Sequence, residues 1–339
     1  MNAPLRSAPL GRSTAWTSTL AFGGAAVGNL FTETSEEQAA AAVDAAWEAG
    51  IRSFDTAPHY GLGLSERRIG AALHGRPRSE YTVSTKVGRV LEPVPVVTGD
   101  DLANGFAVPA THRRVWDFSP DGVRRSLDDS LSRLGLDYVD IVYVHDPDDH
   151  EEQALREAYP ALERLRGEGV VKAIGVGMNQ AAVPARFVRE TDIDVVLLAG
   201  CYTLLEPCGL DELLPLAAQR GVSVVAGGVF NSGLLARPRP GATYSYRPAP
   251  PQMLERALHL QQICEGYGVP LRAVAARFPL GHPSVAAVLI GLRSAREVDD
   301  AIEQYHRPIP DALWQDLRAS GLVAADVPVP DGRRAVREH

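Results

Sequence analysis

Residues 53–70, SFDTAPHYGLGLSERRIG, set the pattern on which the rest of the chain is built. A short apolar β-run at residues 51–54 ends on the carboxylate Asp55. A glycine-containing loop follows and carries Tyr60, and Ser65 then opens a helical pattern. An acid at a strand end, a loop with a phenol and a helix are typical of the way a barrel enzyme places chemistry at the carboxyl ends of its strands.

The same alternation of strand and helix continues along the chain. The apolar runs are near-continuous in Val, Ile and Leu, which is typical of parallel strands buried on both faces. Eight such units favour a closed (β/α)8 barrel, a TIM barrel of the α/β class. We expect strands at 19–24, 51–55, 81–86, 139–145, 171–177, 195–198, 222–226 and 285–290. We expect helices at 35–49, 65–73, 119–134, 152–168, 180–190, 210–220, 253–267, 271–280 and 294–305, with a last amphipathic piece around Trp314.

The chain reads as one barrel domain, because no linker and no internal repeat divides it. We expect a single domain over 1–339, with the barrel at about 19–305, an N-terminal tail at 1–18 and a C-terminal extension at 306–339. Two segments, 87–118 and 227–251, are rich in Pro and Gly, show no clear period and exceed the usual length of a connection. We therefore expect both to be long binding loops at the carboxyl-terminal mouth of the barrel.

Composition excludes several classes of partner. The 339 residues carry a net charge of −8, whereas contact with phosphates favours a basic face, so we expect no nucleic-acid partner. No stretch approaches the ~20 continuous apolar residues that cross a bilayer, and the N-terminus lacks the apolar centre of a secretory signal. We expect a small-molecule substrate, no membrane partner and a cytoplasmic location, while the sequence leaves the oligomeric state open.

The three cysteines, Cys201, Cys208 and Cys264, are few and unpatterned, which suits a reducing compartment. Cys201 and Cys208 raise the alternative of a metal or redox pair. Their spacing matches no zinc pattern, so we predict buried apolar packing for them and no metal site.

Four ionisable residues fall where the predicted barrel brings them together. Asp55 ends the second strand, Lys86 the third and His145 the fourth, and Tyr60 lies in the loop after the second strand. Each alone has an ordinary structural explanation, as a hydrogen-bond acceptor, a solvated cation or a packing residue. Because strand ends of a parallel barrel face one mouth, the four together predict a shared site.

This combination of groups is suited to moving a proton on or off an oxygen. A tyrosine with a pKa of about 10 is a poor acid or base at neutral pH, and a nearby ammonium lowers that pKa. Asp55 supplies the counter-charge that a buried lysine requires. His145 can hydrogen-bond the substrate oxygen and orient it. Nothing in the set provides a nucleophile with its base or a metal-bound water.

Asp55, Tyr60, Lys86 and His145 resemble, one by one and in the same order, the four catalytic positions of the aldo-keto reductase family. The resemblance runs from about residue 20 to residue 305. It implies a general acid/base role for Tyr60, a pKa-lowering role for Lys86, pairing of Asp55 with Lys86 and orientation of the reacting oxygen by His145. It also implies hydride transfer with a nicotinamide cofactor that lies extended across the barrel mouth.

The family resemblance also implies cofactor contacts. Asn179 corresponds to one member of the pair that holds the carboxamide, and the serine of that pair is absent here. Gly227 stands where the family often stacks an aromatic ring on the nicotinamide. The segment with Phe230, Ser232 and Gly233 resembles the strap over the pyrophosphate. Gly23, at the end of the first strand, is also expected to contact the cofactor.

The strand-to-helix turn at 290–297 is placed for the anionic end of the cofactor. It contains Gly291, Arg293 and Glu297 and lacks the Lys and Arg that members using the 2′-phosphorylated cofactor often have in register. A carboxylate repels a 2′-phosphate but can hydrogen-bond a free ribose hydroxyl. NAD is therefore slightly favoured over NADP, and Arg293 and Arg296 keep both open.

Three segments, 144–150, 175–180 and 230–233, resemble a narrower branch of the family. That branch holds D-threo-aldose 1-dehydrogenases, L-fucose dehydrogenases and pyridoxal 4-dehydrogenase-like proteins. The resemblance implies oxidation of an aldose hemiacetal to its lactone, with Trp116, Phe118 and Phe230 as candidate walls for the sugar or else as packing residues. Reduction of small aldehydes, ketones or a pyridoxal-type substrate, and a non-enzymatic cofactor-binding regulatory barrel, are the alternatives.

Overall fold

Eight parallel strands close into a barrel in the computed structural model, which describes residues 5–330. The strands follow chain order around the barrel, and the last pairs with the first. They are β3 (Leu20–Gly23), β4 (Ser53–Asp55), β5 (Thr82–Val87), β10 (Ile141–His145), β11 (Ala173–Met178), β12 (Val195–Ala199), β13 (Ser223–Gly227) and β16 (Val285–Gly291). The predicted (β/α)8 barrel is confirmed.

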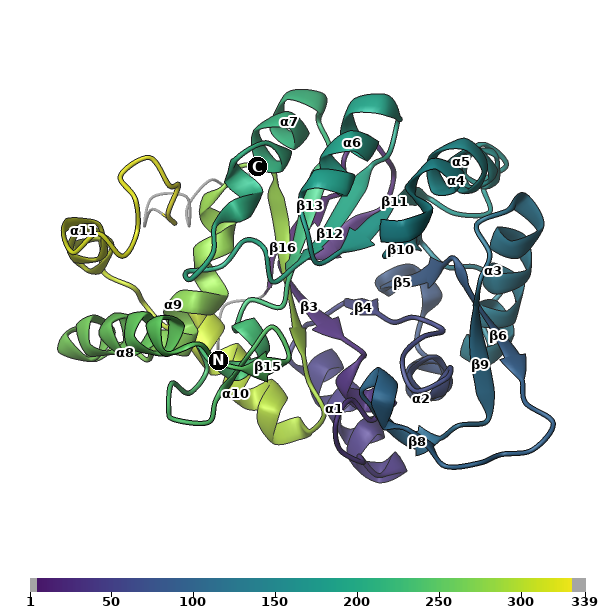
Figure 1. Cartoon of the computed structure of the whole chain (residues 1–339), viewed down its shortest axis with the longest axis horizontal. Helices are drawn as coiled ribbons and strands as arrows, with labels where there is room; N and C mark the ends of the chain where they lie inside the picture. Colours follow the sequence, from purple (N-terminus) through teal and green to yellow (C-terminus); the bar gives the residue numbers. More distant parts are fainter. Residues whose placement is uncertain (1–4, 331–339) are drawn as a thin grey trace.

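Helices cover the outside of the barrel (Figure 1). They are α1 (Glu36–Glu48), α2 (Leu64–Leu73), α3 (Pro120–Leu134), α4 (Glu151–Gln153), α5 (Tyr159–Gly167), α6 (Ala182–Glu190), α7 (Leu213–Arg220), α8 (Pro251–Gly266), α9 (Leu271–Arg277), α10 (Ala295–His306) and α11 (Asp311–Ala319). Local sequence sets their ends. Helix α3, for example, begins after Ser119, whose hydroxyl accepts from the Gly122 amide at 3.0 Å, and ends at the left-handed Gly135.

Two apolar layers hold the barrel together. The larger lies between the strands and the surrounding helices and includes Phe22, Val83 and Val176. The smaller fills the barrel interior and is built from alternate strand residues such as Tyr143 and Leu197. Close packing of this kind is what a parallel barrel buried on both faces requires.

Residues 5–18 and 306–330, on either side of the barrel, contain more regular structure than the sequence predicts. The segment expected to be an N-terminal tail forms an antiparallel hairpin, β1 (Ser7–Pro9) and β2 (Trp16–Ser18), and its Leu10 joins the barrel-interior cluster. In the expected C-terminal extension, α11 packs against α8 and buries Trp314. The outermost parts of both segments, 1–4 and 331–339, lie outside the described residues.

The two long loops contain strands of their own. Segment 87–118, predicted to be irregular, forms two antiparallel ribbons, β6 (Arg89–Pro93) with β9 (His112–Trp116) and β7 (Asp100–Asp101) with β8 (Phe106–Pro109). Segment 227–251 forms the short hairpin β14 (Thr243–Tyr244) and β15 (Arg247–Pro248). Figure 1 shows β6, β8 and β9 on one side of the barrel, with α8 and α11 on the opposite side.

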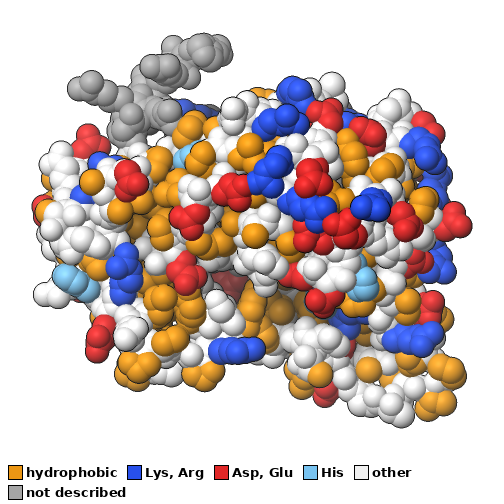
Figure 2. All heavy atoms as spheres, turned by 45° about the horizontal axis from the view of Figure 1, so that its top comes forward, with side chains coloured by type: hydrophobic (Ala, Val, Ile, Leu, Met, Phe, Trp, Pro, Cys, Tyr) orange, Lys and Arg blue, Asp and Glu red, His pale blue; other side chains and the backbone are white. Residues whose placement is uncertain are grey.

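Side chains of both charge signs are interspersed over the face drawn in Figure 2, without a broad basic patch on that face. Over residues 5–330, no helix has the length and apolar character needed to span a membrane.

Candidate active site

The four residues predicted to share a site do meet at the mouth of the barrel. Lys86 Nζ donates to Asp55 Oδ2 at 2.7 Å and to the Thr56 carbonyl at 2.8 Å. The Ser84 hydroxyl donates to Asp55 Oδ1 at 2.7 Å, so both carboxylate oxygens have partners. Lys86 and Asp55 are buried, at 1% and 4% exposure, and this ion pair is shielded from solvent.

Tyr60 and His145 complete the cluster. Lys86 Nζ lies 4.7 Å from the centroid of the Tyr60 ring. The rings of Tyr60 and His145 are 6.0 Å apart and nearly perpendicular. A cation, a carboxylate, a phenol and an imidazole are therefore packed around one small volume, and their catalytic roles stay predictions.

Backbone packing fixes the loop that carries Tyr60. Gly61 adopts φ +62°, and a Cβ added there would lie 2.2 Å from the Gly28 carbonyl oxygen. A Cβ on Gly28 would in turn lie 2.9 Å from the Tyr60 carbonyl. Ser65 adds a third constraint, because its hydroxyl donates to the Gly24 carbonyl at 2.8 Å. Only glycines permit this approach, which holds Tyr60 over the end of β5.

The pKa of Tyr60 lies above its ordinary value, whereas the sequence led us to expect a lowered one. Burial raises the pKa of Tyr60 to about 12, although the charge of Lys86 and hydrogen bonding to it act in the opposite direction. Lys86 thus acts on the Tyr60 pKa in the direction expected from the sequence, but burial outweighs it and the pKa lies above its ordinary value. Burial opposes the charge on Lys86 as well, but Asp55 and Tyr60 outweigh it and raise the Lys86 pKa.

His145 is held neutral. Its pKa lies well below the ordinary value, first because the ring is buried and then because Arg89 and Lys86 repel a second cation. A neutral imidazole has one N–H donor, so it can hydrogen-bond a substrate oxygen without carrying a positive charge.

Sequence reasoning did not identify His59 and Arg114. Arg114 Nε donates to His59 Nδ1 at 2.5 Å, so the His59 proton lies on Nε2. The remaining guanidinium nitrogens of Arg114 bind Asp101 at 2.6 and 2.8 Å, which ties β9 to β7 of the second ribbon, while the bond to His59 ties β9 to the site. Burial lowers the pKa of His59 to about 2, and Arg89 and Arg114 add to the effect. The position of His59 next to Tyr60 was the available signal.

The predicted cofactor positions at strand ends all reach the same mouth. Gly23, Gly227 and Gly291 close β3, β13 and β16, and Asn179 directly follows β11. A Cβ would meet no atom within 4 Å at Gly291 and none closer than 3.6 Å at Gly227. Gly291 therefore leaves open, bare backbone at the rim, which fits the approach of an extended dinucleotide, whereas a Cβ on Gly23 would lie 3.1 Å from the Ile290 carbonyl oxygen.

The segment predicted to strap the cofactor reaches across to the loop after β3. The Ser232 hydroxyl accepts from the Tyr246 amide at 3.0 Å, and the Tyr246 ring lies 5.7 Å from that of Phe31. Phe230 and Gly233 flank Ser232, so the three predicted residues form the base of this strap.

Arg293 and Glu297 lie at the start of α10 and contact each other. The Glu297 carboxylate accepts from the Arg293 amide at 2.9 Å, and Arg293 Nε lies 3.8 Å from its other oxygen. Both side chains are partly exposed at this helix N-terminus, so either can approach an adenosine end.

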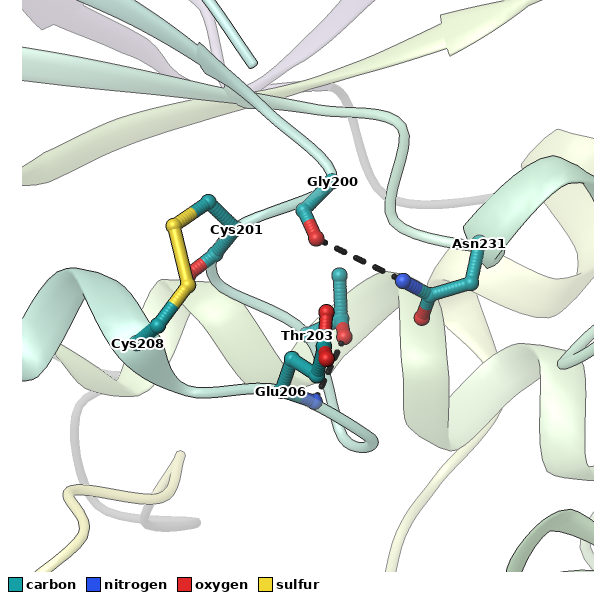
Figure 3. Close-up of a disulfide and its surroundings, with 6 residues drawn as sticks. All are labelled: Gly200, Cys201, Thr203, Glu206, Cys208 and Asn231. Carbon is teal, nitrogen blue, oxygen red and sulfur yellow. Dashed lines mark hydrogen bonds between the residues drawn. A yellow bond between two sulfur atoms is a disulfide. The ribbon is translucent and has the colours of Figure 1, made fainter. Parts of the chain in front are cut away.

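Cys201 and Cys208 form a disulfide across a tight turn, with their Cα atoms 5.5 Å apart (Figure 3). The prediction of unlinked apolar packing is therefore wrong for this pair, although Cys264 is free and buried as expected. The turn adjoins the strap, because Asn231 Nδ2 donates to the Gly200 carbonyl at 3.4 Å. The cytoplasmic location, inferred in part from the cysteines, stays a prediction.

The aromatic substrate candidates separate in the structure. Trp116 is 44% exposed on β9, whereas Phe118 is fully buried in the core and stacks on Trp116 with ring centroids 5.8 Å apart. Phe118 therefore packs behind Trp116 and offers no face to a ligand. Within residues 5–330, no group of three His, Cys, Asp or Glu side chains could hold a metal ion.

Comparison with known proteins places this site in context. Residues 19–321 match the model of the Aldo/keto reductase family. The chain is 46% identical over 309 residues to a D-threo-aldose 1-dehydrogenase of a Pseudomonas species, covering 90% of this chain and 94% of that protein. It is 39% identical over 335 residues to a pyridoxal 4-dehydrogenase of Microbacterium luteolum, covering 93% and 97%. An aldo-keto reductase of Bacillus halodurans in its holo form superposes with a TM-score of 0.73 at 28% identity, covering 97% and 99%.

Proposed function

The chain belongs to the aldo/keto reductase family and is an oxidoreductase of that type, and we propose that it oxidises the cyclic hemiacetal of an aldose to its lactone. L-Fucose or a similar D-threo-aldose is the proposed substrate, and a nicotinamide dinucleotide is the cofactor. The similarity to a D-threo-aldose 1-dehydrogenase over nine-tenths of the chain supports this substrate class.

The observation that carries the proposed chemistry is the buried Lys86–Asp55 pair beside the Tyr60 phenol. Tyr60 would accept the proton of the anomeric hydroxyl as the C–H bond on that carbon breaks. The bound cofactor would supply the hydride acceptor. The carbon thus loses a hydride, which is one proton with two electrons, and the hydroxyl proton is left on Tyr60. In the reverse direction the same phenol is the proton donor.

Lys86 and His145 would assist without taking the proton themselves. Lys86 stays an ammonium because Asp55 holds its pKa high, and its charge favours the phenolate that forms as Tyr60 gives up its own proton. His145, kept neutral, would donate a hydrogen bond to the reacting oxygen and set its direction. Because Lys86, Asp55 and His145 are all buried, water would be excluded from the proton transfer.

We propose NAD as the preferred cofactor. Glu297 is partly exposed at the turn after β16 and carries a negative charge that a 2′-phosphate would meet. Arg293 lies beside it and moderates the effect, so we expect a modest preference. Initial rates with NAD and NADP at matched concentrations measure it, and Glu297→Gln should raise the relative rate with NADP.

A pyridoxal-type or small aldehyde substrate is the second candidate, favoured by the 39% identity to a pyridoxal 4-dehydrogenase. A non-enzymatic regulatory barrel is disfavoured because all four predicted catalytic residues are present and in contact.

Purified protein should be incubated with L-fucose, other aldoses, pyridoxal and simple aldehydes, each with NAD and NADP in the appropriate redox state. We expect the highest kcat/KM in oxidation of a D-threo-aldose, followed as absorbance of the reduced nicotinamide. A higher kcat/KM for pyridoxal would instead select the second candidate, and absence of turnover with every substrate would refute the enzymatic proposal.

A further inference from the structure

Asp146, the residue directly after His145, has an unusual backbone conformation. Its φ of +41° lies in the left-handed region that residues other than Gly, Asn and Asp rarely adopt. Its amide donates to the Gly177 carbonyl at 3.0 Å, which fixes the turn against the end of β11. Strained backbone that the surroundings enforce is concentrated at functional sites. The turn leaves the Asp146 carboxylate 3.5 Å from His145 Nε2.

Arg89 pairs with this carboxylate from the ribbon. It is the first residue of β6, and its guanidinium forms an ion pair with Asp146 while lying 4.5 Å above the Trp116 ring. The preceding Gly88 adopts φ +108°, and a Cβ there would lie 2.2 Å from the Phe118 ring, so the chain approaches this wall as only glycine allows. The Arg89 side chain is 11% exposed and that of Asp146 29%. The pair is thus recessed but reachable.

Arg89 retains an unused donor. Its Nε is buried and has no hydrogen-bond partner among the described residues. A buried N–H without a partner is costly unless something else supplies an acceptor. Asp146 also has free acceptor capacity, because its ion pair with Arg89 leaves further carboxylate lone pairs.

The pair lies beside the two rings of the site. The Asp146 carboxylate is 3.5 Å from His145 Nε2, and the His145 ring is 6.0 Å from the Tyr60 ring. Arg89 interacts with Tyr60 and lowers the pKa of His145. A ligand whose reacting oxygen contacts Tyr60 and His145 would therefore bring its neighbouring atoms to Asp146 and Arg89.

We propose that Asp146 and Arg89 form a clamp for the hydroxyl group on the carbon next to the reacting one, and so select polyhydroxylated substrates. A sugar hydroxyl can donate to the carboxylate and accept from the guanidinium at the same time. His145 Nε2 and the Asp146 carboxylate lie 3.5 Å apart, so oxygens on adjacent carbons of one sugar can contact the two side chains together. This inference rests on the proposed aldose oxidation, since a simple aldehyde offers the clamp no hydroxyl.

The test compares L-fucose with 2-deoxy-L-fucose, which lacks the adjacent hydroxyl, in the wild type and in Asp146→Asn. Asn tolerates the left-handed backbone, so this variant should fold. We expect wild-type kcat/KM to favour L-fucose by about 10- to 100-fold, the range for a hydrogen bond to a charged group. In the variant the preference should fall to within about threefold, mainly because kcat/KM for L-fucose falls. Cofactor binding should be unchanged.

Arg89→Gln provides a second variant that removes the other half of the clamp, and it should lower the same preference. Asp148→Asn is the matched control, because Asp148 lies on the same loop but is exposed and bonds Gln180 instead. It should leave both substrates unaffected.

Equal losses for the two sugars in Asp146→Asn would mean that Asp146 only positions His145, and would overturn the clamp. An unchanged preference in both variants would overturn it as well. These outcomes differ from failure of the proposed function, which would appear as absence of sugar turnover in the wild type and would remove the clamp with it.

Discussion

Replacing Asp55 with Asn tests the ion pair at the base of the site. Lys86 would keep its bond to the Thr56 carbonyl at 2.8 Å but lose the carboxylate at 2.7 Å, in a place where the two side chains are only 2% and 6% exposed. Removing one partner of a buried ion pair costs about 3–5 kcal/mol, because the other charge is left uncompensated. We expect a loss of unfolding free energy of that size when Lys86 is protonated.

The loss should depend on pH, with a sign that identifies its cause. In the wild type the Lys86 pKa is raised, so the pair contributes fully below the pKa of an unfolded lysine and its contribution disappears as pH rises through the folded pKa. In Asp55→Asn the uncompensated ammonium has a lowered pKa instead. The variant should therefore be most destabilised at acidic pH and recover toward alkaline pH as Lys86 loses its proton.

Chemical denaturation of both proteins at several pH values, with turnover measured in parallel, provides the assay. Asp140→Asn is the control, because Asp140 is as buried and binds Arg78 at 2.6 Å and Lys172 at 2.8 Å, away from the mouth. It should lower stability without a comparable loss of turnover. An Asp55→Asn protein that lost less than about 1 kcal/mol at acidic pH and kept wild-type turnover would refute the reasoning.

Three further outcomes are expected. Because burial raises the pKa of Tyr60 to about 12, the rate of oxidation should rise roughly tenfold per pH unit toward alkaline pH, and a plateau in the pH–rate profile near neutrality would contradict this. Gly175→Ala would place a Cβ 1.8 Å from the Val195 carbonyl oxygen, and the overpacking should cost about 3 kcal/mol in thermal or chemical unfolding. Reducing the Cys201–Cys208 disulfide should lower stability by about 2 kcal/mol, the loop-entropy value for so short a ring, and identical unfolding with and without reductant would argue against the bond.

The parts of the fold that depend on local pattern could be predicted from the sequence. The apolar runs that carry Asp55, Lys86 and His145 are strands with these residues at or next to their carboxyl ends, and parallel topology alone brings the three together. The direction of the Tyr60 pKa could not be predicted in the same way. It depends on how the folded protein surrounds the Tyr60 ring, and the neighbours of that ring, Phe106 and His145, are distant in the sequence.

The ribbons and the clamp depend on contacts between distant residues. Strands β6 and β9 pair Arg89 with Trp116 across a segment interrupted by prolines, so no periodicity marks them. The partner of Arg89, Asp146, is 57 positions away along the chain, and no local pattern around either residue predicts the pairing. The cysteine pair shows the same limit, since only the turn at 200–209 brings Cys201 to Cys208.

The central claim is that Tyr60 carries the proton in a reaction coupled to hydride transfer. Tyr60→Phe removes one hydroxyl and keeps the ring that packs against His145 and Phe106. Turnover of L-fucose, or of the best substrate in the panel, should fall by about 10²- to 10⁴-fold while nicotinamide binding, measured by fluorescence titration, is unchanged. Turnover within a few-fold of the wild type, with the same pH profile, would contradict the account.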